Sequence, residues 1–256
     1  MTELSYFRPP GQLFVELGIV EPSQIDIEAI AQHCGATVVY EALVGSEAYI
    51  LGHRDRAIIA VNAAASRGRQ RFSAAHELGH WMRDRGTASF SCEKRKMFLE
   101  RRQEDPERLA NVYAVDLLLP EPMFIPRAKG KEITFDAVRV LTQEFNTSLT
   151  ATAIRLVKLG SFPSILVYCE GNRKKWATFG PDIFLRLREE PGPNSIAYDL
   201  LRGSGGTDRP CDVYADEWVE HRRADRYSVR EHSIRSGTGV LTLLWWKDEG
   251  LLLERG

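Results

Sequence analysis

The spacing of apolar residues in the first half of the chain predicts a helix followed by a small sheet. Residues 25–31 place apolar side chains at helical intervals, and a short strand is expected at 37–40. Two further apolar runs, 48–51 and 57–61, flank the charged stretch 52–56 as two strands of a hairpin flank their connection. The expected order is therefore helix, strand and hairpin.

Two longer helices are expected after the hairpin. The first covers about 70–83, and the second runs from near Pro106 to about Leu119, with the polar stretch 84–105 between them. Proline suits a first helical turn because its amide has no hydrogen to leave unpaired. Pro120 then prevents the second helix from continuing.

The second half of the chain changes character after a pair of short helices. These helices are expected at 135–141 and 151–159, with capping oxygens in the turn 146–148. Strand-like runs follow at 164–168, 175–179 and 239–246. The patterns predict an α+β fold class with domain boundaries that give residues 1–125, 126–160 and 161–256.

Composition and charge exclude several classes of protein. The chain has 256 residues, of which 43% are hydrophobic, and a net charge of -1. This allows one sizeable core or two smaller ones, and it gives no global basic field for nucleic acid. No apolar run approaches the ~20 residues that span a bilayer, and the first residues lack an export signal. A cytoplasmic protein without membrane contact is expected.

The cysteines and most of the histidines carry no pattern of their own. The cysteines are scattered and form no CxxC pair, which fits reduced thiols in a reducing compartment. They are Cys34, Cys92, Cys169 and Cys211. The histidines outside the motif described next are expected at the surface or in loops, and they are His33, His53, His221 and His232.

The predicted helix at 70–83 contains the sequence His76-Glu77-Leu78-Gly79-His80, which has the form HExxH. Positions i and i+4 lie on one face of a helix, so the two imidazoles can converge on one tetrahedral metal ion. Glu77 points elsewhere and is predicted to act as general base on a metal-bound water, whose pKa zinc lowers toward ~7. The competing interpretation is a chance match inside an ordinary helix.

Glu107 supplies the third ligand in this hypothesis. A catalytic zinc site uses three protein ligands and keeps one position open. Glu107 begins the second long helix, and Asn111 lies four residues further on the same face. Asn111 is predicted to orient a ligand histidine from outside the coordination sphere. The competing interpretation is that Glu107 only complements the positive end of its helix.

These two segments together resemble the ImmA/IrrE family of metallopeptidases. RQRFSAAHELGHWM at 69–82 and ERLANVYAVDLLLP at 107–120 are similar to the family patterns RxRFTxAHELGH and ExxANxFAxxLLMP. The departures are Ser73, Tyr113 and Leu119, and none of them falls on a proposed ligand. The resemblance covers about 24–160 and is weak beyond it.

The resemblance implies a zincin-like peptidase fold, with His76, His80 and Glu107 as ligands of one Zn²⁺ ion and Glu77 as general base. Mn²⁺ is expected as a substitute in vitro. It also implies a zinc metalloendopeptidase (EC 3.4.24-type) that cleaves a helix-turn-helix repressor and so derepresses a stress, DNA-damage or anti-phage operon. Residues 126–160 would form a helix-turn-helix-like segment, and 161–256 a GAF-like sensory domain.

Such a protease must stay silent until a signal arrives. The predicted activators are single-stranded DNA or a small molecule bound by the C-terminal domain. Cys92 lies between the two ligand motifs, and its thiolate is a candidate inhibitory zinc ligand that would fill the open position. The competing interpretation of Cys92 is a partly buried thiol without a role.

Two other functions remain open at this point. One is a DNA-binding transcriptional regulator that uses 131–160 and keeps the metal as a structural element. The other is a metal-dependent hydrolase of small molecules. For the peptidase, an edge strand is expected to pair with the substrate backbone, and the two candidate strands are 48–51 and 57–61.

Overall fold

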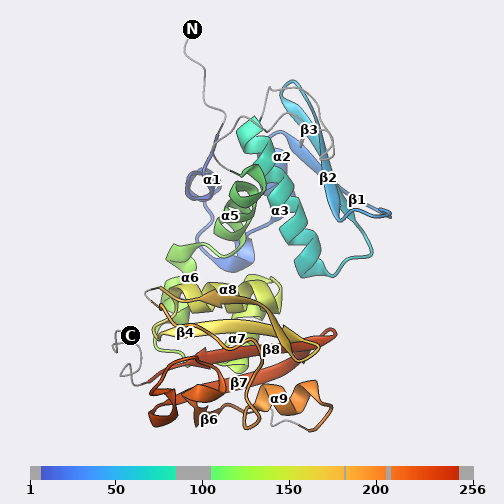
Figure 1. Cartoon of the computed structure of the whole chain (residues 1–256). Helices are drawn as coiled ribbons and strands as arrows, with labels where there is room; N and C mark the ends of the chain where they lie inside the picture. The colour runs from blue at the N-terminus through green and yellow to red at the C-terminus, as the bar shows by residue number, and fades with distance from the viewer. Residues whose placement is uncertain (1–6, 85–104, 182, 206–208, 248–256) are drawn as a thin grey trace. The chain divides into compact units, whose positions relative to one another are not determined.

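The computed structural model describes residues 7–84, 105–181, 183–205 and 209–247. The chain divides into two compact units, and each is described below by itself (Figure 1). The N-terminal unit contains Met1–Phe124 together with the short segment Thr142–Ser148. The second unit contains Ile125–Leu141 and Leu149–Gly256, so the chain leaves the first unit, returns to it briefly and leaves it again.

The helices and strands of the N-terminal unit follow the predicted order. They are α1 (Pro10–Leu17), α2 (Ile27–His33), β1 (Ala36–Glu41), β2 (Ala48–His53), β3 (Arg56–Asn62), α3 (Arg67–Asp84) and α5 (Pro106–Leu118), with a 3-10 turn at Pro22–Gln24. Asp26 caps α2 by accepting hydrogen bonds from the backbone amides of Glu28 and Ala29, which fixes where that helix begins. Helix α1 was not among the predicted elements.

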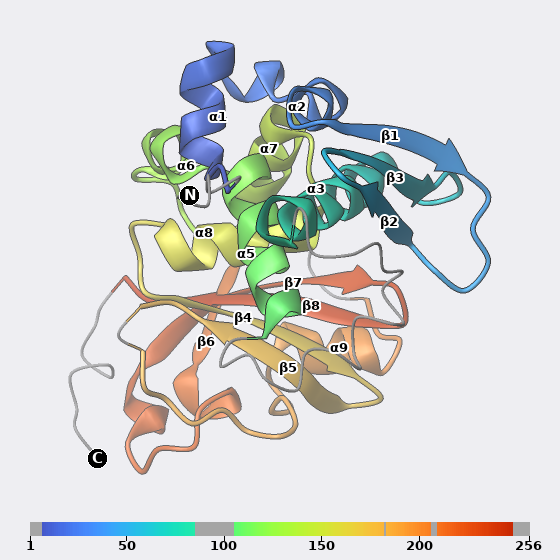
Figure 2. The same cartoon turned by 90° about the horizontal axis from the view of Figure 1, so that it is seen from above.

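The sheet of this unit has the strand order β1-β3-β2. Strand β3 pairs in parallel with β1 and antiparallel with β2, with Ile50 opposite Ile59. The hairpin prediction is confirmed, but β3 is the central strand, so the candidate substrate-pairing edge at 57–61 is wrong. Ile59 and Val61 are buried while Ile58 is half exposed, because one face of the sheet packs against α3 (Figure 2).

Helices α3 and α5 pack closely at a glycine of the HExxH sequence. A Cβ atom added to Gly79 would lie 3.1 Å from the Cβ atom of Tyr113 and 3.2 Å from the Cα atom of Ala110. Any larger residue would therefore push the two helices apart. Gly79 lets α5 approach the histidine-bearing helix closely enough for side chains of both to meet.

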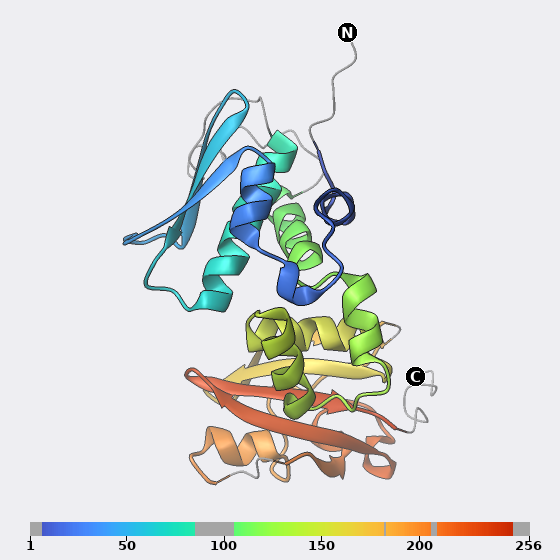
Figure 3. The ribbon, with the colours of Figure 1, turned by 180° about the vertical axis from the view of Figure 1, so that it is seen from behind.

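The second unit is built on a five-stranded sheet in which every pairing is antiparallel. Its strand order is β5-β4-β8-β7-β6. The strands are β4 (Ser164–Glu170), β5 (Arg173–Phe179), β6 (Cys211–Tyr214), β7 (Ser228–Ser236) and β8 (Gly239–Trp245), and the helices from α6 on are α6 (Glu121–Ala128), α7 (Phe135–Phe145), α8 (Leu149–Leu159) and α9 (Ile196–Leu201). Helices α7 and α8 lie over one face and α9 over the other (Figure 3).

The mixed α+β character of the chain is confirmed, as are the two helices expected around residues 146–148. The turn between them contains Asn146 in a left-handed conformation, at a φ of 51°. The division into three domains stays a prediction, and so does the GAF-like nature of the second unit. Within the described ranges, no helix combines the length and apolar character needed to cross a membrane.

His232 corrects the expectation that the remaining histidines lie at the surface or in loops. It is fully buried in β7, and its Nδ1 atom accepts a hydrogen bond of 3.0 Å from the Phe135 amide at the start of α7. The Phe135 ring meets the imidazole edge-on at 5.2 Å between centroids. The histidine therefore joins a helix to the second sheet.

Candidate metal centre

Helix α3 presents His76 and His80 on the same face, one turn apart. Their rings are nearly perpendicular, with 4.7 Å between centroids, and the two Nε2 atoms lie 3.1 Å from each other. Two neutral imidazoles bring lone pairs together at such a distance unless a proton or a cation lies between them. The helix therefore converges two nitrogen donors on one point.

Helix α5 brings Glu107 to this point. Asp105 caps the helix by accepting a 3.0 Å hydrogen bond from the Glu107 amide, which places Glu107 in the first turn. Its Oε2 atom lies 3.2 Å from Nε2 of His76, and its Oε1 atom lies 3.3 Å from Nε2 of His80. Of the described residues, these three form the group whose ligand atoms lie within 4.8 Å of one another.

Solvent reaches this cluster from one side. The side chain of His80 is 1% exposed, that of His76 is 16% exposed, and that of Glu107 is 53% exposed. The nitrogen donors are thus held by the protein interior while the carboxylate borders solvent. This arrangement leaves room on the Glu107 side for a further ligand or a substrate.

Asn111 lies beside the ring nitrogen of His76 that faces away from His80 and Glu107. Its Oδ1 atom lies 3.0 Å from Nδ1 of His76, so the amide oxygen accepts the imidazole N–H. An imidazole that donates through Nδ1 keeps its lone pair on Nε2, which is the atom facing His80 and Glu107. The contact selects the tautomer that a metal ligand requires.

Glu77 stands apart from the three-residue cluster although it follows His76 directly. It is 3% exposed and projects from a different side of α3. Cys92, the candidate inhibitory ligand, lies outside the described residues.

The donor set fits a divalent metal ion. With bonds of about 2.0–2.1 Å, a tetrahedral site places neighbouring donor atoms about 3.3 Å apart. The two Nε2 atoms lie 3.1 Å apart, and the two Glu107 oxygens lie 3.2 Å from His76 and 3.3 Å from His80 respectively. Two imidazole nitrogens and a carboxylate are also a ligand combination that zinc accepts.

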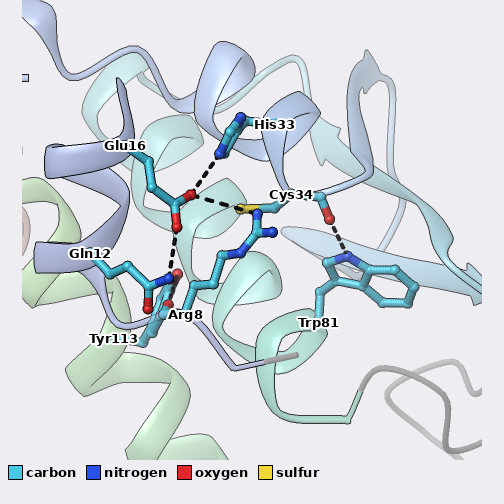
Figure 4. Close-up of polar contacts among 7 residues, drawn as sticks. All are labelled: Arg8, Gln12, Glu16, His33, Cys34, Trp81 and Tyr113. Carbon is cyan, nitrogen blue, oxygen red and sulfur yellow. Dashed lines mark hydrogen bonds and ion pairs between the residues drawn. The ribbon is translucent and has the colours of Figure 1, made fainter. Parts of the chain in front are cut away.

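Several contacts that the sequence did not single out hold the two helices in place (Figure 4). The indole Nε1 atom of Trp81 donates to the Cys34 carbonyl at 2.9 Å, and the Tyr113 hydroxyl donates to the Arg8 carbonyl at 3.1 Å. Burial raises the pKa of Tyr113 well above its ordinary value, which keeps the hydroxyl a donor. Their only signal in the sequence is one aromatic residue within each of the two helices that carry the proposed ligands.

Helix α1 is tied to α2 in the same region. Oε2 of Glu16 lies 2.8 Å from Nε2 of His33, and Oε1 of Glu16 accepts a 2.7 Å hydrogen bond from Gln12 (Figure 4). The bonds from His33 and Gln12 lower the pKa of Glu16. This exposed network supports the N-terminal segment that includes the carbonyl of Arg8.

Comparison with known proteins places this geometry in a family. Residues 31–157 match the family described as the IrrE N-terminal-like domain, a range that contains all of the clustered side chains. The chain belongs to the ImmA/IrrE family of metallopeptidases. An ImmA/IrrE metallopeptidase domain implies a divalent metal, typically zinc.

A curated relative of this ImmA/IrrE protein is the radiation response metalloprotease IrrE of Deinococcus radiodurans. The two are 28% identical over 163 residues, which are 61% of this chain and 48% of the relative. The chain thus spans about half of that relative's length.

A solved structure, that of a Mycobacterium tuberculosis transcriptional regulator, is similar in fold. Its TM-score is 0.57 at 17% identity, and the match covers 92% of this chain and 73% of that one. The family match ends at residue 157, whereas the fold similarity continues into the second sheet.

Proposed function

We propose that the chain is a zinc-dependent endopeptidase in which His76, His80 and Glu107 hold the ion. The observation that carries the proposal is the set of 3.1–3.3 Å separations among the ligand atoms of three residues from two helices: the two Nε2 atoms and the two Glu107 oxygens. Family membership supports the same chemistry. Asn111 is proposed to keep His76 in the metal-binding tautomer.

Glu77 is proposed as the general base. A zinc ion held by the three ligands would supply Lewis acidity that polarises a peptide carbonyl and lowers the pKa of water. Glu77 would take a proton onto a carboxylate oxygen from the attacking water and deliver it to the leaving amide nitrogen.

Strand β2 is proposed to pair with the backbone of the substrate. It is an edge strand, since the sheet order leaves β1 and β2 at the two sides. A Cβ atom on Gly52 of β2 would lie 2.6 Å from the Trp81 ring, so this edge packs beside the residue that follows His80. An extended peptide added to β2 would gain main-chain hydrogen bonds near the cluster.

The proposed substrate is a helix-turn-helix repressor, and cleavage would release a stress, DNA-damage or defence operon. The radiation response for which the Deinococcus relative is named supports a stress setting. The second unit is proposed as a GAF-like sensor for single-stranded DNA or a small molecule. Cys92 is proposed as an inhibitory ligand of the zinc ion in the silent state.

The experiment combines metal analysis with cleavage of a helix-turn-helix protein encoded beside the gene. Wild type should contain about one zinc ion per chain and cut this protein, and chelator should stop the reaction. Glu77→Gln should retain zinc and cut at least ~100-fold more slowly, because the proton acceptor is lost. Glu47→Gln serves as a matched control, since Glu47 is an exposed partner of Arg69 on the protein surface.

Each other outcome has a definite meaning. Normal cleavage by Glu77→Gln, or a purified active protein without metal, would refute the peptidase mechanism. Zinc retained by a protein that binds DNA and cuts nothing would favour the DNA-binding regulator with a structural metal. Cys92→Ser should raise basal cleavage if the thiolate blocks the ion, and unchanged basal cleavage would remove that part of the proposal.

A further inference from the structure

A second polar site lies in the N-terminal unit, at the first turns of α3. It is a pocket of about 510 Å³, a volume within the range of small-molecule sites. Its charged and polar walls come from the start of α2, from β1, from α3 and from the turn after α7. The side chains that matter below are Asp26, Glu28, Tyr40, Arg67, Arg71 and Asn146.

Arg71 is the unusual member of this pocket. It is only 9% exposed, and its Nε atom is buried without a hydrogen-bond partner. A buried guanidinium normally faces an acceptor, because desolvation of an unpaired charge costs several kcal/mol.

The neighbouring carboxylates do not satisfy this cation. Oδ1 of Asp26 accepts hydrogen bonds of 3.0 and 3.1 Å from the amides of Glu28 and Ala29 as the cap of α2. Oε1 of Glu28 accepts the hydroxyl of Tyr40. Both acids act on Arg71 through space, but neither hydrogen-bonds to it.

Burial and Glu28 keep Tyr40 a neutral donor. Burial, followed by the bond to Glu28, raises the pKa of Tyr40 to about 12. Its hydroxyl is therefore committed to Glu28 across the physiological range. The pocket is therefore lined by two carboxylates that accept hydrogen bonds from the chain, the acidic wall, and by arginines, the basic wall.

The basic wall is reinforced by a second arginine and by a helix end. Arg67 lies four residues before Arg71 on the same face of α3, and both line the pocket. Burial, and then the charge of Arg67, lowers the pKa of Arg71. Helix α3 begins at Arg67, so its positive end adds to the same potential. An anion between the two guanidinium groups would relieve their mutual repulsion.

We propose that this pocket binds a small molecule through a carboxylate or phosphate group held by Arg71 and Arg67. A planar guanidinium grips either group with two parallel hydrogen bonds. Asp26 and Glu28 line the same pocket, so they favour a ligand whose other end is neutral or cationic. This site is separate from the metal ligands and does not depend on the proposed peptidase function.

Binding is tested on the full chain with three probes at constant ionic strength: inorganic phosphate, acetate and glutamate. Sodium chloride serves as the reference salt. A saturating probe should raise the thermal midpoint, by about 3–6 °C for each tenfold rise in concentration above Kd. Phosphate alone identifies a phosphoryl ligand, and acetate or glutamate identifies a carboxylate. A tighter fit of glutamate than acetate supports the acidic wall.

Variants of neighbouring arginines assign the effect to the pocket. Arg71→Gln should weaken probe binding by about 10- to 100-fold, because a charge-assisted pair of hydrogen bonds is lost. Arg67→Gln should also weaken it, and Arg67 is exposed, so folding is safe. Arg69→Gln is the control, since Arg69 lies on the same helix but pairs with Glu47 outside the pocket.

The proposal fails if none of the probes binds saturably to wild type. It also fails if binding survives in Arg67→Gln at the affinity of the Arg69→Gln control. Circular dichroism confirms that each variant is folded. Should Arg71→Gln unfold, Arg67→Gln decides the question alone.

Discussion

The two units of the molecule each contain a cluster of polar side chains. The clusters differ in whether the chain itself supplies hydrogen-bond donors to the carboxylate oxygens. In the N-terminal unit, the donor atoms of His76, His80 and Glu107 face one another at 3.1–3.3 Å. In the second unit, the carboxylate of Glu231 is fully buried, and each of its oxygens accepts hydrogen bonds from the chain itself.

The contacts of Glu231 complete the comparison. Oε1 accepts the Ala197 amide at 2.8 Å and the Ser233 hydroxyl at 2.7 Å, and Oε2 accepts the indole N–H of Trp218 at 3.0 Å. Hydrogen-bond donors that meet acceptors, as around Glu231, stabilise a fold. Ligand atoms that face one another with their lone pairs, as in His76, His80 and Glu107, are instead suited to bind a cation. The difference separates a structural carboxylate from a candidate ligand although both are glutamates near aromatic or imidazole rings.

The largest expected effect comes from removing a nitrogen donor. His80→Ala should lower zinc affinity by more than the 10- to 100-fold that is usual for losing an outer partner of a metal ligand. Competition with a chromogenic chelator measures this. His53→Ala is the control, because His53 is exposed at the end of β2. Equal zinc affinity in the two variants would contradict the assignment of the cluster.

Removing the carboxylate of Glu231 should cost stability and leave metal binding unchanged. Glu231→Ala abandons three buried donors and opens a small cavity, for a loss of about 2–4 kcal/mol in the free energy of unfolding. Urea denaturation measures it. Glu220→Ala, which removes only a surface ion pair with Arg186, should cost less than ~1 kcal/mol. A change of zinc content in Glu231→Ala would erase the distinction between the clusters.

Gly79 tests how closely α3 and α5 must pack. Gly79→Ala should destabilise the protein by about 1–3 kcal/mol and weaken zinc binding, because the added methyl group meets Tyr113 and Ala110. Gly11→Ala is the matched control, since nothing lies within 4 Å of a Cβ there and α1 gains helix propensity. Thermal unfolding measures the stability of the two variants, and zinc titration measures their affinity for the ion. An unaffected Gly79→Ala would mean that the close approach is unnecessary.

The smallest expected effect is a pH dependence of Glu231. Burial raises the pKa of this carboxyl, while bonds from Ser233 and Trp218 pull it down. The native state therefore binds this proton more tightly than the unfolded chain does. The contribution of protonated Glu231 to the free energy of unfolding is complete below the ordinary glutamate pKa. It is lost as pH rises through the raised pKa of the native state. Wild type should thus lose stability relative to Glu231→Gln as pH rises, in parallel urea titrations. A difference independent of pH would contradict the raised pKa.

Elements with a clear local period were predictable from the sequence, as α3, α5 and the β2–β3 hairpin show. The ligands could be proposed from the sequence because HExxH on a helix places two histidines on one face, and because Glu107 lies in the first turn of the next predicted helix. Which hairpin strand is central was not predictable, because the parallel pairing of β1 with β3 joins distant segments.

Strand β7 was not predicted because charged and polar residues interrupt its hydrophobic pattern. Its middle reads Arg230, Glu231 and His232, which suggests a solvated segment. Both faces of the strand are nevertheless covered, with Trp218 against Glu231 and Phe135 against His232. Only partners distant in sequence make these polar residues acceptable inside a core.

The double crossing of the chain between the units has a practical consequence for anyone who truncates it. The segment Thr142–Ser148 belongs to the N-terminal unit, where the ring centroids of Phe145 and Phe124 lie 5.4 Å apart. A Cβ atom added to Gly68 would lie 3.0 Å from the backbone nitrogen of Ser148, so the segment also packs against the start of α3. A recombinant fragment that stops after Phe124 would expose the ring of that phenylalanine and the start of α3. An expression boundary therefore belongs beyond Ser148, and limited proteolysis should not cut within Thr142–Ser148.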